Sequence, residues 1–334
     1  MRGSESDAEK LLRMLAADPM LFPFEWDRRT GMIEFVGLRE EEYEQASFLD
    51  ERALGPTTVR GIVPFELVQA LELSTTKPCN FIFHVSHCGS TLLSRLLGLH
   101  AGVFSLREPR VLRTFYSQKP FDIHWLFGLL SRTFRADQMA LIKATSYCNA
   151  FASDWLACLG ESKAVLLTIP LRPFLASVLD GALVDIQSHK DERWQRLKAL
   201  QVVEGQQIET LSTGQLAAMS WLCEMLTLEA VAERFEDRCL RVRFDMLLKE
   251  PSAMLDSIAL FLGLAAPLPL WAQHPIWDQY AKRPGVFYNS EMRSLLLVQA
   301  ERAFEEEINE GVRWIESLDH PRVSKLLLRL QAEG

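Results

Sequence analysis

A short polar run between an apolar segment and an amphipathic segment has the composition of an anion-binding loop. The run is His87-Cys88-Gly89-Ser90-Thr91. A strand, a tight turn and a helix in this order would aim several backbone N–H groups and the positive end of the helix at one point. Gly89 lets the backbone approach an anion closely, and the hydroxyls of Ser90 and Thr91 add donors. Taken alone, the run is equally compatible with an ordinary strand–turn–helix that has a Ser/Thr cap.

Residue spacing argues against three other uses of this loop. A Walker A loop needs a lysine before the hydroxyl residue and a second, upstream glycine, and both are missing. A cysteine-dependent phosphatase needs an arginine six positions after its cysteine, but that position is Ser94 and the arginine is Arg95. The Gly-x-Ser-x-Gly elbow of lipases is also absent. We therefore interpret Cys88 as a small turn residue, and a magnesium-dependent NTPase is disfavoured.

Three charged residues each end or follow a short apolar segment, namely Glu108, Lys143 and Arg172. Ligands of parallel sheets bind beyond the carboxyl ends of the strands, so these residues are expected at one rim. Lysine is rarely buried without a partner, and arginine offers a planar, always-charged fork. A sulfate or phosphate would partner Lys143 and Arg172, although a structural ion pair remains the alternative for both.

A base that accepts a proton is also expected at this rim. Glu108 is the first candidate, and its alternative role is structural, binding loop amides or the neighbouring Arg107 and Arg110. His84 and His124 are further candidates. His84 lies inside an apolar segment, which is more typical of a core histidine with satisfied hydrogen bonds.

The apolar periodicity predicts strands that alternate with helices. The expected strands are 80–85, 103–106, 139–143, 164–169 and 241–244, and the clearest helices are 91–99, 215–235, 251–262, 290–318 and 323–330. A hairpin is expected in the N-terminal region at 22–26 and 32–36. Such alternation predicts an α/β fold with a parallel β-sheet flanked by helices.

The chain divides into three expected regions. Residues 1–76 form an N-terminal extension that ends in a linker at 74–78 and contributes a candidate cap over an acceptor site at Phe48–Arg52. Residues 77–264 form the α/β core, with a helical insertion at 181–237, and residues 265–334 pack as a loop and helices on this core. The acceptor pocket is expected between 1–76, 115–138 and 181–237, where aromatic residues suit either an apolar acceptor or core packing.

The loop and the residues around it resemble the sulfotransferase superfamily, and most closely a bacterial branch whose loops read His-Cys-Gly-Ser-Thr. The resemblance covers about residues 80–264 and rests on five pieces in order. They are the loop itself, Glu108-Pro109, Lys143-Ala144-Thr145, Leu171-Arg172-Pro173, and Val242–Leu247 followed by Pro251 and Phe261-Leu262-Gly263-Leu264. The resemblance implies the P-loop NTPase-like sulfotransferase fold with an N-terminal extension and helical insertions.

The resemblance also implies a donor, 3′-phosphoadenosine 5′-phosphosulfate, and a product, adenosine 3′,5′-bisphosphate, with no metal. The donor-binding residues would be Cys88, Gly89, Ser90, Thr91, Arg172, Ser177, Lys282 and Arg283. His87, Glu108 and Lys143 would be catalytic. His87 stands where the family commonly has a lysine beside the bridging oxygen. Asp180 stands where it commonly has a serine, and we expect Ser177 to replace that serine because a carboxylate near a phosphate is unfavourable.

Composition limits the partners and the location. The chain has 334 residues, is 48% hydrophobic and 24% charged, and carries a net charge of −8. The acidic balance argues against a nucleic-acid surface, so a small-molecule acceptor is expected, and a homodimer is among the assemblies the sequence allows. None of its six cysteines forms a CxxC pair. These thiols, and the lack of a signal peptide or an apolar run long enough to span a membrane, indicate a cytoplasmic protein.

Three functions remain open at this point. The first is a sulfotransferase with a hydroxyl or amine acceptor. The second is a P-loop-like kinase or other phosphoryl transferase, which should need magnesium. The third is a catalytically silent relative that binds a nucleotide.

Overall fold

The computed structural model describes residues 7–71, 73, 78–114, 123–283 and 285–332. Its centre is a five-stranded sheet in the order β5-β6-β4-β7-β8, and every neighbouring pair is parallel. The strands are β4 Cys79–His84, β5 Val103–Arg107, β6 Met139–Lys143, β7 Ala164–Thr168 and β8 Cys239–Arg243. The predicted α/β fold with a parallel sheet flanked by helices is confirmed.

The burial of the strands explains why their sequence signal is clear. All residues of β4, β5 and β7 are buried, as expected for parallel strands covered on both faces. The edge strand β8 is less buried and begins two residues before the predicted segment. Phe244, which we expected to end this strand, instead begins helix α12.

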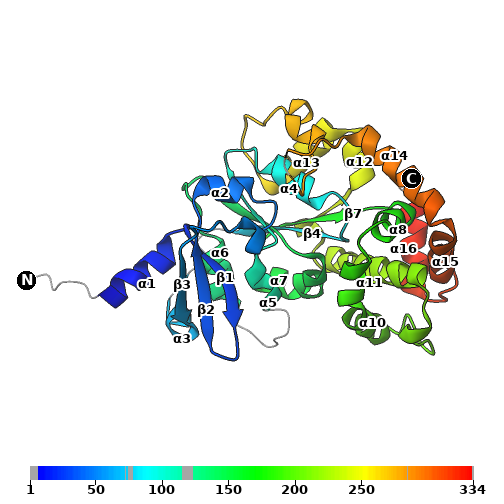
Figure 1. Cartoon of the computed structure of the whole chain (residues 1–334), viewed down its shortest axis with the longest axis horizontal. Coiled ribbons are helices and arrows are strands. Elements are labelled where there is room, and N and C mark those ends of the chain that lie inside the picture. The colour runs from blue at the N-terminus through cyan, green and yellow to red at the C-terminus, as the bar shows by residue number, and fades with distance from the viewer. Residues whose placement is uncertain (1–6, 72, 74–77, 115–122, 284, 333–334) are drawn as a thin grey trace, which may run out of the picture.

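Helices cover both faces of the central sheet. Figure 1 shows α4, α12 and α13 above the sheet and α7 and α11 below it. The helices of this part of the chain are α4 Ser90–Leu97, α5 Arg110–Thr114, α6 His124–Leu130, α7 Ala152–Cys158, α8 Leu171–Leu179, α12 Phe244–Lys249 and α13 Pro251–Leu262. As predicted, Pro251 begins α13, and Gly263 follows its last residue in the left-handed conformation.

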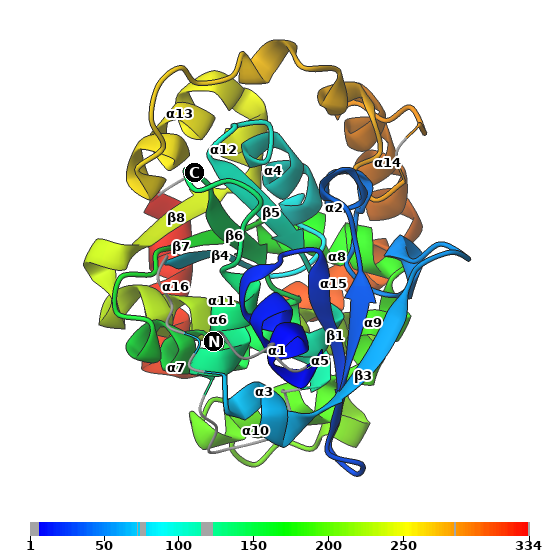
Figure 2. The same cartoon turned by 90° about the vertical axis from the view of Figure 1, so that its left-hand side faces the viewer.

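The N-terminal region contains an antiparallel sheet of its own (Figure 2), built from β1 Leu21–Asp27, β2 Met32–Gly37 and β3 Arg60–Pro64. The pairing of β1 with β2 confirms the predicted hairpin. We missed β3 because most of its residues are exposed and the apolar alternation is absent. The helices here are α1 Asp7–Ala17, α2 Glu40–Gln45 and α3 Phe65–Gln69. Residues 74–77 of the predicted linker lie outside the described residues.

The helical insertion contains α9 Leu183–Ser188, α10 Lys190–Ala199 and the long helix α11 Thr213–Arg234. Ser212 caps α11 and forms a reciprocal capping box with Gln215. Gly214 then allows a close crossing with the C-terminal helix α15, because a Cβ at this position would lie 1.9 Å from the Glu307 carbonyl oxygen.

The C-terminal region differs from our expectation of one helix over 290–318. The structure has two helices there, α14 Ser290–Ala303 and α15 Glu305–Glu316, followed by α16 Pro321–Ala332. The break falls at Phe304, whose backbone leaves the helical region with φ −120° and ψ 30°. A contiguous apolar core joins the N-terminal sheet, the central sheet and these helices. Among the described helices, none combines the length and the apolar character needed to cross a membrane.

Candidate functional site

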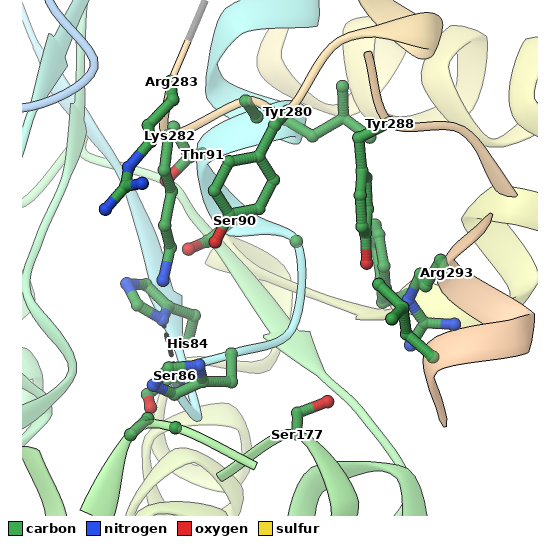
Figure 3. A pocket seen from close by; sticks show the side chains of 18 of the residues that line it. His84, Ser86, Ser90, Thr91, Ser177, Tyr280, Lys282, Arg283, Tyr288 and Arg293 are labelled. Carbon is green, nitrogen blue, oxygen red and sulfur yellow. Dashed lines mark hydrogen bonds between the residues drawn. The ribbon is translucent and has the colours of Figure 1, made fainter. Parts of the chain in front are cut away.

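A cavity of about 1110 Å³ opens at the carboxyl ends of the central strands. His84 ends β4, Glu108 follows β5 and Thr145 follows β6, and all three line the cavity. Figure 3 shows the loop after β4 facing residues of the C-terminal region across this space. Of the three charged residues expected at this rim, Glu108 lines the cavity, whereas Lys143 and Arg172 do not.

The loop that joins β4 to α4 has an unusual backbone. Ser86, His87 and Gly89 have positive φ angles of 61°, 46° and 75°. Successive residues in this conformation form a concave nest of N–H groups, the geometry that binds anions. Two independent constraints favour glycine at position 89. Its φ is one that glycine adopts without strain, and a Cβ there would lie 2.0 Å from the Phe244 ring.

The loop directs its side chains in two ways. Ser90 and Thr91, in the first turn of α4, line the cavity together with His87 and Gly89. Cys88 is buried on the opposite side, and its Sγ donates to the Leu167 carbonyl at 3.6 Å. Burial raises the pKa of the Cys88 thiol to about 12. The Cys88 side chain is therefore part of the core, which agrees with its interpretation as a turn residue and leaves only its backbone for a donor.

His84 is fixed by two hydrogen bonds. Its Nδ1 accepts from the Ser86 N–H at 3.0 Å, so Nε2 carries the proton and donates to the Ala144 carbonyl at 2.9 Å. Burial lowers the pKa of His84 to about 3. A neutral histidine with both nitrogens engaged is poorly suited to act as a base, and its role is to shape the loop. The other alternative base, His124, is exposed and does not line this cavity.

His87 lies against a carboxylate that the sequence did not single out. Its Nε2 is 3.6 Å from Oδ2 of Asp185, a residue of the insertion helix α9. The hydrogen bond from His87 lowers the pKa of Asp185. His87 and Asp185 both line the cavity, so the pair brings an imidazole and a carboxylate to the loop.

Glu108 is held in a buried network. Its carboxylate binds the Lys143 ammonium, and Arg113 Nη2 lies 3.5 Å from Glu108 Oε2. Burial alone would raise the pKa of Glu108, but the charges of Lys143 and Arg113 outweigh it and lower the pKa below its usual range. Glu108 itself has a positive φ of 50°, a strained conformation that turns it towards the cavity.

Lys143 occupies a different place from the one we expected. Its side chain is fully buried and does not line the cavity, because Glu108 lies between them. The structure pairs this buried lysine with a carboxylate of the protein. Either a carboxylate or a sulfate would neutralise a lysine at a strand end, so the sequence position alone could not distinguish the two partners.

Arg172 also lies elsewhere. It is exposed at the start of α8, where both terminal nitrogens donate to Asn309 Oδ1 of α15 at 3.2 and 3.3 Å. It is absent from the cavity lining, so the structure does not bring it to the loop. Ser177 and Asp180, further along the same helix and at its end, do line the cavity. The Ser177 hydroxyl donates to the Pro173 carbonyl at 2.8 Å and retains its lone pairs.

Three cations of the C-terminal region face the loop. Lys282 and Arg283 line the cavity as predicted, and Arg293 of α14 joins them (Figure 3). Within the described part of the chain, none of the three forms an ion pair or a side-chain hydrogen bond with another residue. The Arg293 guanidinium lies 5.1 Å from the Phe244 ring, and burial lowers its pKa. We missed Arg293 because an arginine in the second turn of an ordinary helix carries no distinguishing pattern.

The remaining walls only partly match the expected acceptor region. Phe48 and Arg52 of the N-terminal region and residues between Asp185 and Arg193 of the insertion contribute. Residues within 277–283 and 286–297 contribute as well, and of these we had expected only Lys282 and Arg283, at the donor site. Of the aromatic residues that suited an apolar acceptor, Trp125 and Phe127 are buried in the core. Phe115, Tyr116 and Phe121 lie outside the described residues.

The six cysteines are free thiols, of which five are buried and Cys158 is exposed. Across the residues that the structure describes, no group of three or more His, Cys, Asp or Glu side chains has the arrangement of a metal site.

No family model and no curated protein matches the sequence. Three of the solved structures that resemble this chain are sulfotransferases, each at low identity and with a TM-score below 0.5. A sulfotransferase domain from the curacin biosynthetic pathway is 15% identical, with a TM-score of 0.45 over 77% of this chain and 99% of that one. A sulfotransferase from Alicyclobacillus acidocaldarius is 13% identical, with a TM-score of 0.35 over 75% of this chain and 99% of that one. A sulfotransferase from Mycobacterium tuberculosis is 13% identical, with a TM-score of 0.35 over 71% of this chain and 79% of that one.

Proposed function

We propose that this protein is a sulfotransferase that moves a sulfuryl group from 3′-phosphoadenosine 5′-phosphosulfate to a hydroxyl or amine. One observation carries the proposal. An anion-binding loop without a Walker lysine faces three cations, Lys282, Arg283 and Arg293, that have no carboxylate partner among the described residues. Unpaired cations around such a loop favour a ligand with several negative charges. The sequence resemblance of the loop and its neighbours selects the donor.

The donor would bind with its 5′-phosphosulfate on the loop. The N–H groups of 86–91 and the hydroxyls of Ser90 and Thr91 would hold the 5′-phosphate. In the view of Figure 3, Lys282 and Arg293 lie on opposite sides of Tyr288, and Ser177 lines the same cavity. We assign Arg293 and Ser177 to the 3′-phosphate, in place of the arginine that the sequence suggested. Lys282 and Arg283 would balance the remaining charge of the donor.

The transfer needs charge stabilisation on the leaving side. The bond from sulfur to the bridging oxygen breaks, and the acceptor oxygen or nitrogen forms the new bond to sulfur. Negative charge then develops on the bridging oxygen of the nucleotide. His87, whose Nε2 lies 3.6 Å from Asp185 Oδ2, would donate a hydrogen bond or a proton to this oxygen.

Glu108 would receive the acceptor proton. Because its pKa is lowered, it is a weak base before the reaction begins. The acceptor becomes more acidic as its bond to sulfur forms, so the proton would move late in the step. Lys143 is then a positioning residue that holds the carboxylate of Glu108 at the rim.

Ligand-induced stabilisation tests the donor site. We expect adenosine 3′,5′-bisphosphate without magnesium to raise the melting temperature, since a ligand that binds only the native state stabilises it. Arg293→Gln should weaken the affinity by about tenfold or more, the typical effect of losing a charge-assisted hydrogen bond. Arg302→Gln, on an exposed position of the same helix, is the matched control and should retain the affinity.

The same assay separates the other functions. Stabilisation by ATP with magnesium but not by the bisphosphate would favour a phosphoryl transferase and contradict the proposal. Loss of binding in Arg172→Gln but not in Arg293→Gln would overturn the assignment of the 3′-phosphate. Tight binding of the bisphosphate with no transfer from labelled donor to any compound of a metabolite extract would favour a silent nucleotide-binding relative.

A further inference from the structure

A buried arginine beside the loop has unused hydrogen-bonding capacity. Arg193 of α10 is only 2% exposed, yet it lines the cavity. Its Nε donates to Glu224 Oε1 at 2.8 Å. Its Nη1 is buried and has no hydrogen-bond partner. Leaving a buried charged donor unpaired is costly, so this atom indicates a partner that the protein itself does not supply.

The carboxylates near Arg193 are already shared. Glu224 also binds Arg196, whose Nη2 lies 2.8 Å from the same Oε1. Arg113, another residue of the cavity wall, lies 3.3 Å from Asp50, which Arg52 also binds, and 3.5 Å from Glu108, and its buried Nε has no hydrogen-bond partner. Each of these two guanidiniums therefore keeps a buried N–H group that no acceptor of the described residues satisfies.

Two flat rings line the same cavity as these guanidiniums. His189 stacks on Tyr147 with ring centroids 4.3 Å apart and an interplanar angle of 29°, and both rings line the cavity. Burial lowers the pKa of His189, and the charge of Arg193 lowers it further. This end of the cavity thus combines cations with ring faces, and it is formed by His189 and Arg193 of the insertion together with Arg113 and Tyr147, apart from the C-terminal region that holds Lys282, Arg283 and Arg293.

We propose that the acceptor is a hydroxy compound with a carboxylate, which Arg193 and Arg113 bind while its hydroxyl faces the loop. The inference rests on the proposed function, because it names the substrate class of the same site. A carboxylate matches the planar guanidinium and would satisfy Nη1 of Arg193. The stacked rings of Tyr147 and His189 would contact the apolar body of the acceptor.

Matched acceptors test this proposal. para-Hydroxybenzoate and its methyl ester differ in one charge, as do para-hydroxyphenylacetate and its methyl ester. We expect kcat/KM for transfer from labelled donor to favour each acid over its ester by at least about tenfold. Arg193→Gln should reduce this preference to about threefold or less, mainly through a higher KM for the acid. Arg113→Gln, at a more exposed position, should lower the preference in the same direction.

Arg196→Gln is the control, because it removes the other arginine that binds Glu224 and leaves the guanidinium that lines the cavity. It should retain the preference for acids. An equal loss in both variants, or equal transfer to acids and esters by the unmodified protein, would overturn the carboxylate site.

Ligand-detected NMR with the same compounds separates this proposal from the function on which it rests. Binding of the acids that is weakened by Arg193→Gln would support the site even if no sulfuryl transfer occurs. Equal binding of acids and esters would refute it whether or not transfer occurs.

Discussion

At the scale of single residues, His84 shows how the loop depends on a neutral side chain. Its Nδ1 must accept the Ser86 N–H, which protonation would prevent. An unfolded histidine titrates near pH 6.5, whereas burial lowers the pKa of folded His84 to about 3. The unfolded state therefore binds more protons between these values. The stability that His84 contributes is complete above about pH 6.5 and is lost as the pH falls towards 3.

This linkage predicts a pH-dependent effect of His84→Asn. The asparagine can still accept a hydrogen bond but does not titrate. Between about pH 7.5 and about pH 5, the unmodified protein should lose about 2 kcal/mol of unfolding free energy that the variant does not lose. Urea unfolding at the two pH values measures the difference, and the exposed His124→Asn serves as the control. Parallel pH profiles for His84→Asn and the unmodified protein would show that His84 is not held neutral by the fold.

The residues of the loop could be identified from the sequence, because a glycine followed by small hydroxyl residues between a strand and a helix is typical of an anion-binding turn. Their partners could not. Asp185, Arg193 and Arg293 are ordinary charged residues of helices, and only the fold brings them to the cavity. Arg172 is the opposite case, because the sequence suggested it for the site and the fold directs it elsewhere. A charged residue after a strand can turn towards the cavity or away from it. Here it contacts Asn309 instead of the loop.

At the scale of elements, strands with fully apolar sequences were predictable and exposed or broken elements were not. The strand β3 pairs with β2 through its backbone, so its side chains carry little signal. The interruption between α14 and α15 falls at Phe304, within residues that favour a helix. Tertiary packing, not local preference, determines both features.

The crossing of α11 and α15 gives a prediction at this scale. Gly214→Ala would place a methyl group 1.9 Å from the Glu307 carbonyl oxygen. This oxygen belongs to the backbone of α15, so the clash could be relieved only by a shift of one helix relative to the other. We expect the variant to lose about 1–3 kcal/mol of unfolding free energy, as overpacked cores do. Chemical denaturation measures the change. Gly160→Ala is the control, because a Cβ added at this position would meet no atom within 4 Å. It should change the free energy of unfolding by less than about 0.5 kcal/mol.

A stability close to that of the unmodified protein in Gly214→Ala would mean that the two helices separate easily. The insertion and the C-terminal region would then be less tightly coupled than their contact indicates. The consequence would reach the site, because α10 of the insertion carries Arg193 and α14, which precedes α15, carries Arg293.

At the scale of the whole molecule, the cavity is assembled from segments that are far apart in the sequence. The loop after β4, the insertion and the C-terminal region each form one wall, and Phe48 and Arg52 add a contribution from the N-terminal region. An acidic chain with a net charge of −8 can therefore hold a local group of cations. The loop could be assigned to the core region from the sequence alone. The approach of the C-terminal residues Lys282 and Arg293 to this loop could not be predicted.

This assembly predicts where a bound nucleotide should slow hydrogen exchange. Adenosine 3′,5′-bisphosphate should protect peptides that contain the loop Ser86–Thr91 and peptides that contain Lys282 or Arg293, because these segments share the ligand. Exchange in the antiparallel sheet of β1, β2 and β3 should change little, since that sheet lies outside the proposed donor site. At saturating ligand we expect the protected amides to exchange at least about tenfold more slowly.

Arg293→Gln at the same ligand concentration should reduce protection in the loop as well as around α14, because one ligand couples both walls. Protection confined to the loop would show that the C-terminal cations do not take part in binding, and the donor site would then have to be assigned without them.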